Sequence, residues 1–429
     1  MRFHYGVLFL LLLTGPLSRA QQPPDPEQWR ADIDFLRRQL PAVHPNWYHR
    51  HDEAYWETAL DSISRLAGGQ SDLATALQLQ QAVARMGDSH TRLDFGSFVD
   101  TDHCLPVAGY YFADGVFITH AMPPFGHLLG QQWQSINGQP MDTVLQILSG
   151  LFTIDNEATY WLKSTQLLSH PDILQALRFF PAKNDSVSIG LRDSLGHDHT
   201  IALPLVPLQQ FRSTAQLLRP DTLPLAYRDT RRLFWSEYFP ADSLYYVQYN
   251  KCTSQEVASQ NRDRRRPQDL PAFAPFAEEV LQTVREEPIK TFIFDLRHNT
   301  GGSSPQGQHL IEALGEVAQL QLPGCTYLIL GRSTFSSAVL NAVTFTEVFP
   351  EVITIGEPTS GSPTHFGEVR QFNLPRTGLR VWHSTKYFIR EPRDATTLEP
   401  AFRIPFRFED YRHGVDAVLD HIHQMANGQ

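Results

Sequence analysis

The last part of the chain constrains the fold most strongly, because short apolar strands alternate there with helical segments. Strand candidates lie at 244–249, 291–296, 327–330 and 352–355, and helical patterns lie at 272–285, 306–314 and 337–348. Strands that alternate with helices are joined by crossover connections, which set the strands parallel in one sheet. We therefore expect residues 243–429 to form an α/β domain.

Two regions with different sequence patterns come before this one. Residues 21–103 read as a helical module: apolar residues at 29, 33, 36 and 40 follow helical spacing, and Pro41 is expected to end that helix. Residues 104–206 hold short strand candidates separated by turns, including an Asn-Gly turn at 137–138, and predict a small β-rich module. Residues 207–242 show no clear period, and we expect a connection there.

The first 20 residues have the pattern of a secretory signal peptide. Arg2 gives a basic start, residues 7–14 form an apolar run, and Ser-Arg-Ala at 18–20 resembles a cleavage site. The alternative is a membrane anchor, but the run is too short to span a bilayer. No cysteine lies near the junction, which excludes a bacterial lipoprotein. We expect an exported protein, periplasmic or secreted, with no membrane span after removal of the signal.

Composition and motifs exclude several functions. The chain has 46 acidic and 36 basic residues, and its net charge of −10 argues against nonspecific binding of nucleic acid. Three cysteines cannot make a disulfide framework and leave at least one thiol unpaired. No His-Glu-x-x-His pattern supports a catalytic metal, and no phosphate-loop motif supports a nucleotide. We therefore expect no metal and no cofactor.

Gly301 and Gly302 follow the apolar strand at 291–296 and come just before a helical pattern. Two glycines allow close approach of the backbone, and their N–H groups at a helix start form a cradle for an anion. The pair predicts a phosphate loop or an oxyanion hole, and the alternative is a tight turn between strand and helix.

A serine-rich stretch, Ser-Thr-Phe-Ser-Ser-Ala at 333–338, also lies between a strand and a helix. A serine at such a junction projects its hydroxyl, which is the geometry of a nucleophile elbow. The alternative is a simple N-cap. A serine nucleophile needs a base, and His90 is the best-placed candidate because it lies at a helix-to-strand junction. The alternative for His90 is an ordinary packing residue.

Taken together and in this order, four motifs resemble those of the S41 serine peptidases, the tail-specific, C-terminal-processing and tricorn-type proteases. The motifs are Gly-Asp-Ser-His-Thr at 87–91, Asp-Leu-Arg-His-Asn-Thr-Gly-Gly at 295–302, Thr-Phe-Ser-Ser-Ala at 334–338 and Gly-Glu-Pro-Thr-Ser-Gly at 356–361. The resemblance covers most of residues 27–410. It implies a crotonase- or ClpP-like α/β catalytic domain, an N-terminal helical module and a small PDZ-like β-rich module.

The family uses two kinds of base. Tail-specific members have a lysine shortly after the Gly-Glu-Pro-Thr segment, but this chain has Gly-Ser-Pro at 361–363, so a Ser/Lys dyad is not expected. Tricorn-type members use the histidine of a Ser-His pair, and Ser89-His90 matches that pair. The resemblance therefore implies His90 as base and Glu399 as the acid, acting through Ser89. Glu391 is a second candidate for the acid.

Two adjacent serines are candidates for the nucleophile. The Thr-x-Ser pattern gives Ser336, whereas the tail-specific spacing counted back from Gly356 gives Ser337, and we expect Ser336. The resemblance also assigns oxyanion binding to the N–H groups of Gly302 and Ser337. It places three further residues at the substrate site: Gly301, Thr359 and Gly361.

Three functions compete at this stage. The first, which we expect, is an exported serine endopeptidase that cuts proteins or peptides, with the β-rich module holding the C-terminal part of the substrate. The second is a catalytically inactive relative that binds a peptide or an apolar ligand, as the interphotoreceptor retinoid-binding protein repeats in the family do. The third is a different hydrolase or a crotonase-like acyl enzyme. The sequence leaves the oligomeric state and the physiological substrate open.

Overall fold

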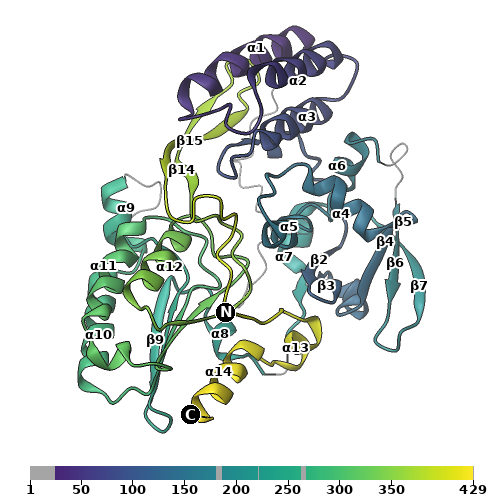
Figure 1. Cartoon of the computed structure of the whole chain (residues 1–429). Coiled ribbons are helices and arrows are strands. Elements are labelled where there is room, and N and C mark those ends of the chain that lie inside the picture. The colour runs from purple at the N-terminus through teal and green to yellow at the C-terminus, as the bar shows by residue number, and fades with distance from the viewer. Residues whose placement is uncertain (1–24, 180–185, 221, 262–266, 429) are drawn as a thin grey trace.

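The computed structural model describes residues 25–179, 186–220, 222–261 and 267–428, and shows three sheets and three regions (Figure 1). The expected signal peptide lies outside the described residues. No helix in the described part of the chain is long and apolar enough to cross a membrane. Cys104, Cys252 and Cys325 are all free and buried.

The helical region lies at the top of Figure 1. It consists of α1 (Pro26–Val43), α2 (Glu53–Leu66) and α3 (Asp72–Arg85). Asp25, Asp52 and Ser71 cap these helices, because each side chain accepts a hydrogen bond from a backbone N–H of the first turn. The expectation that Pro41 ends α1 is wrong by two residues. A proline in the last turn removes one helical hydrogen bond, and the N–H of His44 still donates to the Leu40 carbonyl at 3.0 Å.

The β-rich region forms an antiparallel seven-stranded sheet, in the order β2-β3-β4-β6-β7 with β5 and β8 beside it. Its strands are β2 (Val107–Phe112), β3 (Gly115–Ala121), β4 (Gln132–Ile136), β5 (Gln139–Pro140), β6 (Ser186–Arg192), β7 (Asp198–Pro204) and β8 (Gln216–Leu217). Its helices are α4 (Met141–Ser149), α5 (Glu157–Lys163), α6 (Pro171–Ala176) and α7 (Leu208–Thr214). This region shares one continuous hydrophobic core with the helical region.

The α/β region has a six-stranded sheet in the order β16-β13-β12-β11-β10-β9. The strands are β9 (Phe234–Phe239), β10 (Leu244–Tyr249), β11 (Thr291–Asp295), β12 (Thr326–Leu330), β13 (Ile353–Gly356) and β16 (Phe402–Arg403). The helices are α8 (Leu225–Arg228), α9 (Gln255–Asn261), α10 (Phe273–Glu286), α11 (Ser304–Gly315), α12 (Ser337–Val348), α13 (Phe408–His413) and α14 (Ala417–Asn427). All neighbours from β10 to β16 are parallel, as the alternation predicts, and antiparallel β9 comes from the expected connection.

A third sheet joins the α/β region to the helical region (Figure 1). It pairs β1 (Arg92–Asp94) with the hairpin of β14 (His365–Asn373) and β15 (Arg380–Phe388). At the hairpin tip, the Asp32 carboxylate on α1 accepts hydrogen bonds from the N–H groups of Arg376 and Thr377, at 2.9 and 2.7 Å. Short 3₁₀ helices complete the chain: η1 (Phe95–Phe98), η2 (Pro123–Leu128), η3 (Pro267–Asp269) and η4 (Ala318–Gln321).

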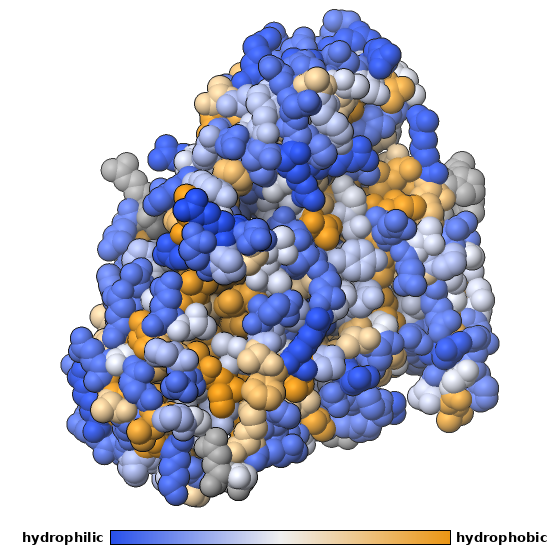
Figure 2. Space-filling model, in the orientation of Figure 1, coloured by the Kyte–Doolittle hydropathy of each residue, from blue (hydrophilic) through white to orange (hydrophobic). Residues whose placement is uncertain are grey.

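The three regions meet near the carboxyl ends of the parallel strands. Ligands of open α/β sheets bind outside these strand ends. Figure 2 shows mostly hydrophilic residues on the viewed face, interrupted by scattered hydrophobic patches. The loops that carry the sequence motifs converge at this junction.

Candidate active site

Ser336 is the last residue of the junction between β12 and α12, and it has unusual backbone angles. Its φ is 56° and its ψ is −125°, a conformation that residues other than glycine rarely adopt. Its side chain makes no capping hydrogen bond to the helix, so the N-cap alternative does not describe how this serine is used. A strained serine at a strand-to-helix turn is the arrangement of a nucleophile elbow.

The glycine loop packs directly against this elbow. Gly301 has a φ of 88°, and a side chain there would lie 2.8 Å from both the Phe335 carbonyl oxygen and Ser336 Cβ. The Gly302 carbonyl accepts a hydrogen bond from Ser337 Oγ at 2.8 Å, which commits the second candidate serine to a structural contact. Within the described residues, no group accepts a hydrogen bond from the N–H of Gly302 or Ser337. Both amides are therefore available to an anion, beside the N-terminus of a 12-residue helix.

The turn that carries His90 is held by a buried carboxylate. Asp88 accepts hydrogen bonds from the His90 N–H at 2.9 Å, from Ser384 Oγ at 2.6 Å and from His44 Nε2 at 3.1 Å. Burial alone would raise the pKa of Asp88, but the hydrogen bonds from His44 and Ser384 and the nearby His90 lower it below its usual value. Asp88 is therefore ionised, and it fixes the backbone of the turn.

The His90 ring is buried but has no fixed hydrogen bond. It is 8% exposed and stacks between Phe335 and His365, with ring centroids 4.6 and 5.5 Å away. Neither ring nitrogen has a hydrogen-bond partner among the described residues. Burial lowers the pKa of His90 to about 3, although the Asp88 carboxylate opposes this. The imidazole is therefore neutral at pH 7.

Ser336 and His90 line the same cavity, which has a volume of about 140 Å³. Its walls come from all three regions: His90 from the helical region, Asp155 from the β-rich region, and Gly361 and His365 from the α/β region. Sequence reasoning missed His365, whose Nδ1 lies 2.7 Å from the Ser362 carbonyl, because no motif marks it. The structure thus brings together a serine and a histidine separated by 246 residues in the chain.

The predicted substrate-site residues lie close to the elbow. The Gly361 N–H donates to the Thr334 carbonyl at 3.3 Å, and Gly361 lines the cavity. Thr359 is wholly buried, and its Oγ1 donates to the Gly361 carbonyl at 2.8 Å, so its side chain shapes the loop. Gly301 supports the elbow from the other side.

The two predicted acids lie elsewhere. The Glu399 side chain is exposed and is not among the residues that line the cavity, so its role stays a prediction. Glu391 is exposed and pairs with Arg393 at 2.9 Å. The carboxylate that accepts a hydrogen bond from Ser89 is instead Asp155, a residue that lies in no recognisable motif.

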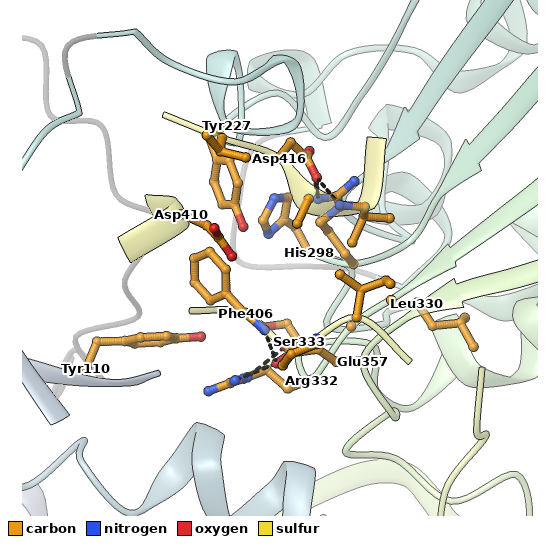
Figure 3. Close-up of a pocket in the computed structure, with 18 residues that line it drawn as sticks. Tyr110, Tyr227, His298, Leu330, Arg332, Ser333, Glu357, Phe406, Asp410 and Asp416 are labelled. Atoms are coloured by element: carbon orange, nitrogen blue, oxygen red, sulfur yellow. Dashed lines mark hydrogen bonds and ion pairs between the residues drawn. The ribbon is translucent and has the colours of Figure 1, made fainter. Parts of the chain in front are cut away.

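A second, smaller cavity of about 60 Å³ lies beside the same strand ends (Figure 3). Arg332 and Glu357 form two hydrogen bonds there, at 2.9 and 2.6 Å. Arg332 also donates to the Tyr111 carbonyl of the β-rich region and lies over the Tyr110 ring, 5.4 Å from its centroid. This arginine joins the β-rich region to the loop that leads to Ser336.

Another charged residue of this cavity, Arg297, is also paired. Arg297 donates to Asp295 at 2.8 Å and to Asp416 at 2.9 Å. Tyr227 and Asp410 point toward the centre of the cavity, next to His298 (Figure 3). Nowhere in the described part of the chain do three His, Cys, Asp or Glu residues gather as a metal site requires.

Comparison with known proteins rests on the fold. No protein-family model and no curated protein matches the chain. The solved structure of mature CPAF complexed with lactacystin has a TM-score of 0.64 at 14% identity, and the match covers 94% of this chain and 99% of that one. The CPAF S499A mutant gives 0.61 at 14% identity and mature CPAF gives 0.59 at 13%, each over 94% of this chain and 98% of the other. The chain therefore has the fold of these CPAF structures.

Proposed function

We propose that the chain is an exported serine endopeptidase with Ser336 as nucleophile and His90 as base. One observation carries the proposal: a serine in a strained backbone conformation and a neutral histidine with free ring nitrogens line one cavity. The fold shared with S41 peptidases supports the same reading. The substrate is a protein or peptide, because this arrangement suits attack on an amide carbonyl.

In the proposed mechanism, His90 takes the proton of Ser336 Oγ as that oxygen attacks the scissile carbonyl carbon. The imidazolium then gives the proton to the leaving amine, and water hydrolyses the acyl-enzyme by the same two steps. The Asp88 carboxylate lies 3.9 Å from His90 Nδ1 and stabilises the imidazolium. The N–H groups of Gly302 and Ser337 bind the oxyanion, where one missing donor typically costs about 10²–10³ in rate.

The proposed third member is Glu399, acting through Ser89, and its support is the sequence resemblance alone. Because Glu399 is exposed and outside the cavity lining, this role requires the segment to move when substrate binds. Ser89 already donates its hydroxyl hydrogen bond to Asp155.

A second candidate function is peptide binding without catalysis. It is favoured by the lack of a hydrogen bond between His90 and Ser336 among the described residues. Catalytic hydrogen bonds are often loose before substrate binds, so this observation weighs less than the strained serine.

The test uses a serine-directed fluorophosphonate and denatured casein with wild type and with Ser336→Ala, Ser337→Ala and His90→Ala. We expect wild type to be labelled and to cleave casein. Ser337→Ala should do both at a reduced rate, and Ser336→Ala should do neither. His90→Ala should lose cleavage. Loss in Ser337→Ala alone would move the nucleophile by one residue. If folded wild type is neither labelled nor active, the result supports peptide binding without catalysis.

Export is tested on the full chain expressed in a bacterium. We expect the protein in the periplasm or the medium with a new N-terminus at residue 21. Retention in the membrane with residues 1–20 attached would support the anchor alternative.

A further inference from the structure

Two adjacent residues of the β-rich region contact both halves of the candidate active site. Asp155 and Asn156 lie between α4 and α5, in a stretch that no sequence motif marks. Asp155 accepts a hydrogen bond from Ser89, the neighbour of His90. Asn156 Nδ2 donates to the Thr359 carbonyl at 3.1 Å, in the loop behind the elbow.

The Asn156 side chain is fully committed to this position. Its Oδ1 caps α5 by accepting from the Thr159 N–H at 2.9 Å, and its Nδ2 also donates to the Thr396 carbonyl at 2.6 Å. Thr159 Oγ1 adds a bond to the Ser360 carbonyl at 2.9 Å. Asn156 Nδ2 also lies 3.5 Å from the Ser360 carbonyl oxygen. The start of α5 therefore holds Thr359 and Ser360 through three side-chain hydrogen bonds.

The loop held in this way supports the nucleophile. A side chain at Gly361 would lie 3.1 Å from both the Ser336 backbone nitrogen and Phe335 Cα, so loop and elbow are in close backbone contact. A shift of the loop would therefore shift Ser336. Asn156 controls the position of the nucleophile through this contact.

Asp155 acts on the base. It lines the cavity beside Ser89 and His90, and the hydrogen bond from Ser89 ties their turn to the β-rich region. Lys163 is the last residue of α5, and its Nζ lies 5.6 Å from the centroid of the Phe335 ring. Burial raises the pKa of Asp155, and the ammonium group of Lys163 opposes this shift.

We propose that Asp155 and Asn156 form a positioning pair, in which Asp155 fixes the His90 turn and Asn156 fixes the loop behind Ser336. This inference rests on the proposed function. Neither residue touches the reacting atoms, and together they set the distance between base and nucleophile. Asp155 thereby competes with Glu399 for the role of partner of Ser89, and the β-rich region aligns the catalytic groups.

The experiment compares kcat and KM for wild type, Asp155→Asn and Asn156→Ala, with Asp142→Asn as the matched control and Glu399→Gln as the test of the competing acid. Asp142 is an exposed aspartate at the start of α4. We expect Asp155→Asn to lower kcat by about 10²-fold with little change in KM, because a misplacement of about 1 Å has that cost. Asp155→Glu should recover part of the rate, and Asp142→Asn should match wild type.

A second readout does not depend on hydrolysis. We expect the ring resonances of His90 in the NMR spectrum to shift in Asp155→Asn and to stay unchanged in Asp142→Asn, with folding checked by thermal unfolding. Wild-type kcat and unshifted His90 signals in Asp155→Asn overturn the inference and leave the proposed function intact. A large loss in Glu399→Gln with none in Asp155→Asn assigns the role to Glu399. If wild type is inert and unlabelled, the proposed function fails, and the His90 signals alone decide on the positioning role.

Discussion

The two cavities lie on either side of one short loop and differ in how the polar groups next to that loop are held. Residues 331–336 follow β12 and supply Arg332 to one cavity and Ser336 to the other. Around Arg332 the charges are paired with hydrogen-bonded partners at short distances. Around Ser336 the backbone is strained and both nitrogens of His90 are unbonded. Strained and unsatisfied groups persist where the surrounding structure holds them in place, and they cluster at functional sites.

The largest expected effect is the loss of activity in His90→Leu. We expect the rate to fall by about 10⁴-fold or more, because the general base is gone. Stability should stay the same or rise by about 1 kcal/mol, because two buried unbonded nitrogens are removed. The measurements are casein hydrolysis and thermal unfolding.

The matched control in the other cavity is His298→Leu. His298 Nε2 lies 3.2 Å from the Ala226 carbonyl, so we expect this change to destabilise the protein by about 1 kcal/mol. If His90→Leu destabilised the protein as much as His298→Leu does, the contrast between the two cavities would be wrong.

Arg332→Met should have the next largest effect, on stability. It leaves the buried Glu357 carboxylate without its partner and releases the Tyr111 carbonyl, so we expect a loss of about 3–5 kcal/mol. The double change Arg332→Met with Glu357→Leu should restore most of that loss, because no unpaired charge remains. Urea unfolding of both variants measures this. An Arg332→Met protein as stable as wild type would contradict the structural role of this pair.

Gly301→Ala tests the contact between the glycine loop and the elbow. A Cβ there would lie 2.8 Å from Ser336 Cβ, and the φ of 88° disfavours alanine. Either the loop or Ser336 must move, so we expect kcat to fall by about 10²-fold. Gly138→Ala is the control, since a Cβ at that turn meets nothing within 4 Å despite its φ of 76°. Equal rates in the two variants would rule out close packing at the elbow.

The sequence predicts those parts of the site that are encoded locally. The His90 turn, the glycine loop and the serine junction each follow a recognisable helix or strand, and alternating elements predict the parallel sheet. Asp155 and Lys163 carry no such signal, because their contacts with the site arise from tertiary packing of the β-rich region. The Glu399 prediction rests on a short local match, and the structure leaves that side chain exposed.

The last expected effect concerns the dependence of stability on pH, to which one histidine from each cavity contributes. Burial lowers the pKa of both His90 and His298 to about 3, below the usual 6.5. Between these values the unfolded chain binds more protons than the folded one, so stability is complete above about pH 6.5 and falls as the pH decreases. At pH 5 each histidine should remove about 2 kcal/mol. His90→Leu and His298→Leu should each flatten this dependence in urea unfolding at pH 5 and pH 7. An unchanged slope in His90→Leu would mean that the His90 ring is solvated rather than buried.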